Sequence, residues 1–107
     1  MDSKTITFEV NVKILKEIES DYVEWTLQHM KQVLEVEGFI SAQMRKLENE
    51  SNEFYFYSIC YIALNKVKID LYFKNNAQTL RQSGIDKFGD KWSIERRIML
   101  NSLTFTK

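Results

Sequence analysis

The stretch 54-FYFYSICYI-62 decides the fold, because it predicts a β-strand with hydrophobic side chains on both faces. Alternation divides these side chains into two sets, Phe54, Phe56, Cys60 and Ile62 on one face and Tyr55, Tyr57, Ile59 and Tyr61 on the other. Helices can cover only one face of such a sheet, and the open face of an antiparallel sheet is usually polar. We therefore expect an aromatic, apolar open face on which the strand tyrosines lie and which a second copy of the chain covers, as in a dimeric α+β barrel. The alternative is that the C-terminal tail folds over this face in a monomer.

A second strand is expected just before this stretch. Ile40, Ala42 and Met44 alternate with polar residues, which is typical of a strand with one buried face. The polar segment 48–53 separates the two strands, and this close spacing predicts an antiparallel hairpin.

The N-terminal part predicts a strand followed by a helix. Apolar and polar residues alternate over residues 6–12, which indicates a half-buried strand. Ser20 or Asp21 is then placed to cap a helix, with Glu24 completing a capping box from Asp21. Gly38 is well placed to end that helix.

The C-terminal part repeats this order. Asn65 is placed to cap a second helix, which the segment 75–77 breaks or kinks and which Gly89 ends. Residues 92–100 then alternate as a fourth strand. The order β-α-β-β-α-β predicts an α+β, ferredoxin-like fold, in which a four-stranded antiparallel sheet carries two helices on one face.

Length and composition restrict the function. The 107 residues suffice for one domain over 1–107, with a core over about 5–101 and a tail over 102–107. The formal net charge is zero, which disfavours a nucleic-acid partner, and no apolar run reaches the roughly 18 residues of a membrane span. Because Cys60 is the sole cysteine and no signal-peptide pattern is present, we expect a cytoplasmic location. Cys60 lies mid-strand among apolar residues and is expected to be an inert core residue.

The only histidine is the first candidate for chemistry. On a helical wheel, His29 lies just inside the edge of the apolar sector, beside Tyr22 and near Trp25. It is either a packing residue or a catalytic base, because an unperturbed imidazole titrates near pH 6.5.

Arginines on the predicted helix and strand are the second group of candidates. Arg81 shares the apolar face of the later helix, where it snorkels outward, pairs with an acidic side chain or binds an anionic ligand. Arg96 and Arg97 point to opposite faces of the last strand, and we expect internal pairing to satisfy them. One histidine and one cysteine provide no metal-ligand spacing, and no phosphate-binding glycine loop is present, so no metal or cofactor is expected.

Two long runs carry a family resemblance, 23-VEWTLQHMKQVLEVEGFISAQMRKL-47 and 77-AQTLRQSGIDKFGDKWSIERRIML-100. They resemble the small bacterial family named domain of unknown function 4286. The shared pattern comprises Glu24, Trp25, His29, Val33, Leu34, Gly38 and Phe39, and later Leu80, Arg81, Phe88, Gly89, Arg96, Arg97 and Leu100. The chain departs from the family where Gly84 replaces a second histidine, which weakens any mechanism that needs two imidazoles.

The resemblance implies a fold more than an activity. It implies the ferredoxin-like, dimeric α+β-barrel superfamily, which includes cofactor-free monooxygenases, haem-binding enzymes and ligand-binding proteins. Fold alone does not specify which of these functions a chain has.

Three functional hypotheses follow from these residues. The first is a homodimeric protein that binds a small anionic or aromatic molecule between sheet and helices. Trp25 and Tyr57 would supply apolar walls for it, His29 a hydrogen bond and Arg81 the countercharge. The second is a cofactor-free monooxygenase-like enzyme in which His29 is the catalytic base. The third is a purely structural interaction module.

Overall fold

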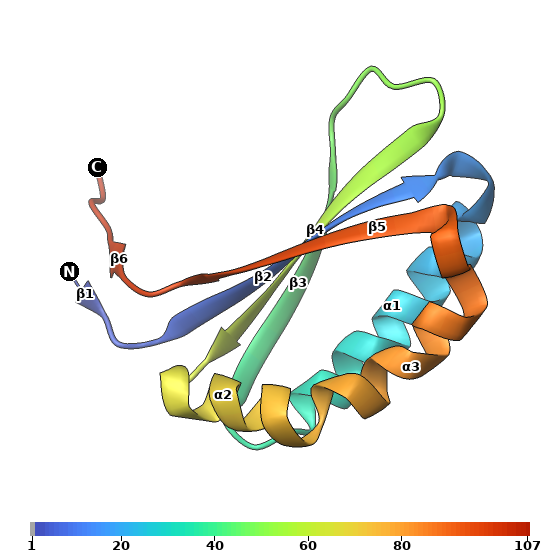
Figure 1. Ribbon diagram of the computed structural model, residues 1–107. Coiled ribbons are helices and arrows are strands. Elements are labelled where there is room, and N and C mark those ends of the chain that lie inside the picture. Colours follow the sequence, from blue (N-terminus) through green and yellow to red (C-terminus); the bar gives the residue numbers. More distant parts are fainter. Residues whose placement is uncertain (1) are drawn as a thin grey trace.

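The computed structural model describes residues 2–107. The main elements follow one another in the order β2, α1, β3, β4, α2, α3 and β5 (Figure 1). Their bounds are Ile6–Leu15 for β2, Glu19–Leu34 for α1, Phe39–Leu47 for β3, Phe54–Ala63 for β4, Lys66–Asn75 for α2, Ala77–Phe88 for α3 and Trp92–Met99 for β5. Two short strands, β1 (Asp2–Ser3) and β6 (Ser102–Leu103), pair with each other near the chain ends. The 3-10 turns Lys16–Ile18 and Gly89–Lys91 precede α1 and β5.

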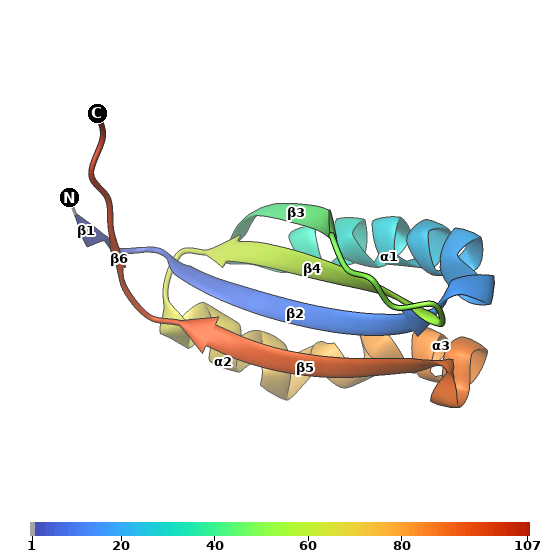
Figure 2. The same cartoon turned by 90° about the horizontal axis from the view of Figure 1, so that it is seen from above.

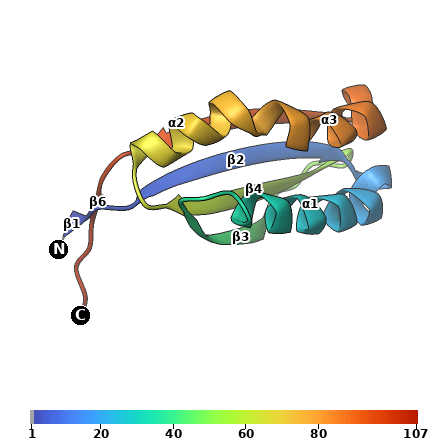
Figure 3. The same ribbon diagram turned by 90° about the horizontal axis from the view of Figure 1, so that it is seen from below.

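The four long strands form one antiparallel sheet in the order β3-β4-β2-β5. All three α-helices lie on one side of this sheet, as Figures 1 and 2 show. The helices α2 and α3 follow one another and run antiparallel to α1 (Figure 3). This arrangement confirms the predicted ferredoxin-like α+β fold.

Most helix ends follow the predicted chemistry. The side chain of Asn65 accepts a hydrogen bond from the backbone nitrogen of Lys68 (3.0 Å) and so caps α2. Asn76 separates α2 from α3, and Gly89 ends α3 with a φ of 54°, a conformation that favours glycine. The predicted capping box at Asp21 is wrong, because the 3-10 turn leads directly into α1 at Glu19, without a side-chain cap.

The expected aromatic open face is wrong, because the strand tyrosines face the helices. Tyr57 and Tyr61 are 5% and 2% exposed in the isolated chain. Their cross-strand partners in β2 are Val12 and Phe8, which belong to the buried set of that strand. Directly paired residues of neighbouring strands share a face, so the register fixes the tyrosines in the core.

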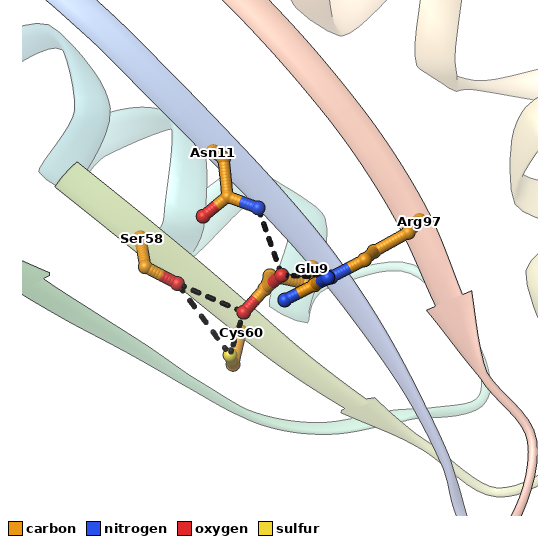
Figure 4. A network of polar contacts seen from close by, with 5 residues as sticks. All are labelled: Glu9, Asn11, Ser58, Cys60 and Arg97. Atoms are coloured by element: carbon orange, nitrogen blue, oxygen red, sulfur yellow. Dashed lines mark hydrogen bonds and ion pairs between the residues drawn. The ribbon is translucent and has the colours of Figure 1, made fainter. Parts of the chain in front are cut away.

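The open face of the sheet is instead mixed in character. Its centre is the carboxylate of Glu9, which is 8% exposed and forms an ion pair with Arg97 (Figure 4). The same carboxylate accepts hydrogen bonds from Asn11 Nδ2 (2.8 Å) and Ser58 Oγ (3.2 Å). Cys60 Sγ lies beside it at 3.9 Å, so the expectation that Cys60 belongs to the helix-covered core is wrong. Of the two adjacent arginines for which internal pairing was expected, Arg97 has its partner here, whereas Arg96 forms no salt bridge with any residue in 2–107.

The two chain ends form an arm beyond the sheet (Figures 1 and 2). There, β6 pairs with β1 in antiparallel register. Leu103 and Phe105 are 74% and 97% exposed, so the tail does not fold over the open face of its own sheet. None of the helices formed by residues 2–107 is long and apolar enough to cross a membrane.

Candidate functional site

A cavity lies between the helix-covered face of the sheet, α1 and α3. It contains about 490 Å³ of space free of atoms, with the open solvent at its mouth included, and the enclosed part is much smaller. The lining residues come from six elements: Phe8, Val10, Val12, Tyr22, Trp25, Thr26, His29, Ile59, Tyr61, Tyr72, Arg81, Ile85, Trp92, Ile94 and Arg96.

Helix α1 lines the cavity with three polar side chains on successive turns. Tyr22, Thr26 and His29 are spaced four and three residues apart, which places them on one face of the helix. They are 1%, 3% and 9% exposed. The hydroxyls of Tyr22 and Thr26 and the Nδ1 atom of His29 are buried, and none has a hydrogen bond of normal geometry. Burial raises the pKa of Tyr22 to about 12, and the nearby Thr26 hydroxyl opposes this rise.

The imidazole of His29 is held in place by stacking. Its ring lies 4.6 Å from the ring of Trp25 with 14° between the planes. The indole nitrogen of Trp25 in turn donates a hydrogen bond to Ser83 Oγ on α3 (2.9 Å). Trp92 meets Trp25 at 81° with 5.4 Å between ring centroids. The orientation of His29 therefore depends on contacts from α1, α3 and β5.

Gly84 allows α3 to approach the two tryptophans. A Cβ atom at this position would lie 2.5 Å from Trp25 Cζ2 and 2.7 Å from Trp92 Cη2. Both distances are well below van der Waals contact, so any side chain here would displace the rings that support His29.

Arg81 brings an unpaired positive charge to the cavity. Its guanidinium lies over the rings of Phe73 (5.4 Å) and Tyr72 (5.9 Å), and its Nη2 atom is buried without a hydrogen-bond partner. Arg96 is exposed and lines the same cavity. Neither arginine forms a salt bridge with any residue of the described range 2–107, and no described Asp or Glu side chain lines the cavity. The site therefore has an excess of positive charge.

His29 is a neutral hydrogen-bonding group at neutral pH. Burial and the positive charge of Arg81 lower its pKa to about 4, with a smaller contribution from Arg96. A hydrogen bond with the Leu80 backbone opposes this change. The Nδ1 atom of the ring is buried without a hydrogen-bond partner of normal geometry, so a polar group of the ring remains to be satisfied.

A family model matches the chain over residues 5–102. The chain belongs to the family described as Domain of unknown function (DUF4286). This confirms the resemblance inferred from the sequence. A search of proteins with curated functions finds no match to this DUF4286 chain.

Solved structures with low sequence identity share the DUF4286 fold. SnoaB, a cofactor-independent oxygenase from Streptomyces nogalater, has a TM-score of 0.72 and 10% identity, covering 98% of this chain and 100% of SnoaB. A conserved protein of unknown function from Bacteroides thetaiotaomicron has a TM-score of 0.68 and 14% identity, with 90% and 96% covered. A dimeric ferredoxin-like protein from an uncultured marine organism has a TM-score of 0.58 and 14% identity, with 92% and 95% covered. At these identities the likeness shows the fold alone.

Of the residues selected from the sequence, the structure brings Trp25, His29 and Arg81 of the DUF4286 chain to one cavity. Tyr57 does not line it. The hydroxyl of Tyr57 instead donates a hydrogen bond to Glu19 Oε2 (2.6 Å), which Lys46 Nζ also contacts at 2.6 Å. Hydrogen bonds from Lys46 first and Tyr57 second lower the pKa of Glu19.

Sequence reasoning does not select Thr26, because a threonine on an apolar helix stripe has no special signal of its own. Its spacing between Tyr22 and His29 could have revealed it. The choice between Arg96 and Arg97 needed the register of β5 on β2, which pairs Arg96 with Val10 and Arg97 with Glu9.

Proposed function

We propose that this DUF4286 protein binds a small organic anion in the cavity between α1, α3 and the sheet. The observation that carries the proposal is the buried, unpaired Nη2 atom of Arg81 in a cavity with no described carboxylate. A buried charge without a partner is costly, and a buried donor without an acceptor costs about 1–3 kcal/mol. A carboxylate fits the planar guanidinium and would remove both costs.

Water alone meets only part of this need. It can satisfy the free hydroxyls of Tyr22 and Thr26 and the Nη2 atom of Arg81. It cannot supply the negative charge that would balance Arg81 and Arg96, and these two arginines repel each other. Burial and the charge of Arg81 lower the pKa of Arg96 itself. An anion is the species that offsets these effects together.

The walls of the cavity indicate the rest of the ligand. The wall consists mainly of aliphatic and aromatic side chains, from the sheet and from Trp25, Trp92 and Ile85. The body of the ligand is therefore apolar or aromatic. The enclosed space is far smaller than the roughly 300–1,000 Å³ typical of ligand pockets. Any ligand larger than a few atoms therefore requires movement of exposed side chains at the mouth, such as Ile85 and Arg96.

Calorimetry and tryptophan fluorescence test the proposal with simple carboxylates, from acetate to benzoate. Both tryptophans line the cavity, so binding should change the intrinsic fluorescence. Arg81→Gln should weaken binding about 10- to 100-fold, the range expected for a lost charged hydrogen bond. Lys87→Gln removes an equal charge from the exposed face of the same helix and should leave the affinity unchanged. Equal affinities for the wild type and Arg81→Gln would refute this function.

We also propose that a second copy of the chain covers the open face of the sheet. The face carries half-buried Phe56 and Ile62 and the 42%-exposed side chain of Leu47. A structural neighbour of the same fold is described as dimeric. Sheet-on-sheet packing would bury these apolar groups, with the Glu9–Arg97 pair near the centre of the contact.

Light scattering tests this assembly with a matched pair of variants. The wild type should have about twice the 12.8 kDa mass of one chain. Leu47→Glu places a charge on the open face and should shift the protein toward monomer. Leu27→Glu changes an equally exposed leucine on the outer side of α1 and should not. A monomeric wild type at high concentration would contradict the assembly.

A cofactor-free enzymatic reaction is the second candidate function. The observation in its favour is a neutral His29 that lines the cavity with its Nδ1 atom unpartnered. With the ring proton on Nε2, Nδ1 could accept the proton of an enol or phenol and form an imidazolium beside the resulting oxyanion. This resembles the catalytic type named for SnoaB. The test needs a substrate whose conversion by the protein consumes O₂. With such a substrate, a His29→Ala variant that keeps the turnover rate of the wild type would exclude His29 as the catalytic base.

A further inference from the structure

The cavity presents two buried polar atoms without hydrogen-bond partners of normal geometry. Nη2 of Arg81 is a donor, and Nδ1 of His29 is a ring nitrogen that donates or accepts according to the tautomer. We infer that the ligand is a small hydroxycarboxylate, whose carboxylate accepts from Arg81 and whose hydroxyl forms a hydrogen bond with Nδ1 of His29. This inference rests on the anion-binding function proposed above and narrows it to one chemical class.

The burial of Nδ1 carries the argument. An apolar group of the ligand at this point would leave the ring nitrogen unpaired, which is costly. A plain carboxylate oxygen can only accept, so it fits one tautomer of the ring alone. A hydroxyl can donate or accept, so it satisfies Nδ1 in either tautomer.

The surroundings keep His29 neutral. Arg81 on α3 and Arg96 on β5 provide the positive charges near the ring, and both disfavour an imidazolium. Tyr22 on α1, Tyr61 on β4 and Tyr72 on α2 line the same cavity, and burial raises the pKa of each phenol, so all three stay uncharged. The ligand therefore meets a neutral imidazole, not an imidazolium, at this end of the cavity.

The free hydroxyls of Tyr22 and Thr26 do not select between ligands. Each can rotate to donate or to accept, so either fits a carboxylate oxygen or a hydroxyl. The fixed groups, Arg81 and His29, impose the requirement for one anionic acceptor and one further hydrogen-bonding group. A site built around a buried polar group discriminates strongly against analogues that leave this group unpaired.

The test uses pairs of acids that differ by one hydroxyl: glycolate with acetate, lactate with propionate, and 2-hydroxybenzoate with benzoate. Calorimetry at about pH 7.5 should give at least one hydroxy acid an affinity about tenfold above that of its partner. In His29→Leu, which removes the ring nitrogens, this ratio should fall to about one while plain carboxylates keep their affinity. His29→Gln retains a hydrogen-bonding side chain and should preserve part of the preference.

The outcomes separate this inference from the function on which it rests. Plain carboxylates that bind as well as hydroxy acids, or a ratio that survives in His29→Leu, would overturn the inference and leave anion binding intact. No binding of any of the six acids would overturn both. Nitrogen NMR of the sole histidine gives an independent reading if the leucine variant does not fold. In that case, glycolate should shift the Nδ1 resonance of the wild type and acetate should not, and equal responses would refute the inference.

Discussion

Mild acid should destabilise this protein through one side chain. The pKa of His29 is lowered from 6.5 to about 4 in the folded state, mainly by burial and then by Arg81. Each tenfold change in proton affinity is worth about 1.4 kcal/mol, so the lowered pKa corresponds to roughly 3 kcal/mol. The unfolded chain binds the proton near pH 6.5 and the folded chain resists it. The stability that a neutral His29 contributes is therefore complete above pH 6.5 and is lost as the pH falls toward 4.

Urea unfolding at several pH values, followed by tryptophan fluorescence, measures this effect. The free energy of unfolding of the wild type should fall by roughly 3 kcal/mol more than that of His29→Gln between about pH 7.5 and 4. The pKa values of Glu9 and Glu19 also lie below their usual range. At Glu9, burial raises the pKa, and the hydrogen bond from Arg97 is the strongest of the contacts that lower it. At Glu19, the hydrogen bond from Lys46 lowers the pKa most. Both carboxylates are present in each protein, so their contribution cancels in the difference. Parallel pH curves for the two proteins would refute the assignment of His29 as a buried, neutral group.

Three further substitutions test the packing described above. Gly84→Ala should lower the free energy of unfolding by about 1 kcal/mol or more, since the clash with both tryptophans exceeds the gain in helix propensity. The control Thr79→Ala changes an exposed residue of the same helix and should not destabilise the protein. A Gly84→Ala variant as stable as the wild type would show that the tryptophan rings are not fixed. Tyr57→Phe should cost about 1–2 kcal/mol in thermal or urea unfolding through the lost bond to Glu19, yet leave carboxylate affinity unchanged, and weakened binding would mean that Tyr57 reaches the ligand. Glu9→Gln should cost about 1–3 kcal/mol, because it removes the charge that pairs with Arg97, and a neutral effect would show that the pair adds nothing to stability.

The order of elements could be predicted because local signals mark each boundary. Asn65, the break at Asn76 and Gly89 act through side-chain capping and backbone conformation, which depend on neighbouring residues alone. The start of α1 could not be predicted in this way, because a preceding 3-10 turn changes where the helix begins.

The face of β4 that the helices cover could be predicted only with information from another strand. Both of its faces are hydrophobic, so alternation within the strand could not tell which one the helices cover. Pairing of Tyr61 with Phe8 and of Cys60 with Glu9 decides it, and such pairing depends on residues about fifty positions apart. The same limit explains why Cys60 was expected in the core and why Tyr57 was expected at the ligand site.

The site was predictable where helix geometry alone applies. Trp25 and His29 are one turn apart and stack as that spacing allows. The convergence of Arg81 on the same cavity depends on the packing of α3 against α1, for which Gly84 is essential, and this tertiary contact has no local signature.

The pKa of His29, followed by NMR with and without acetate, tests the central claim most directly. We predict a value near 4 for the free protein and a higher value with acetate bound, because a carboxylate offsets the charges of Arg81 and Arg96. A value near 6.5 that saturating acetate leaves unchanged would contradict a buried, positively charged cavity that binds anions.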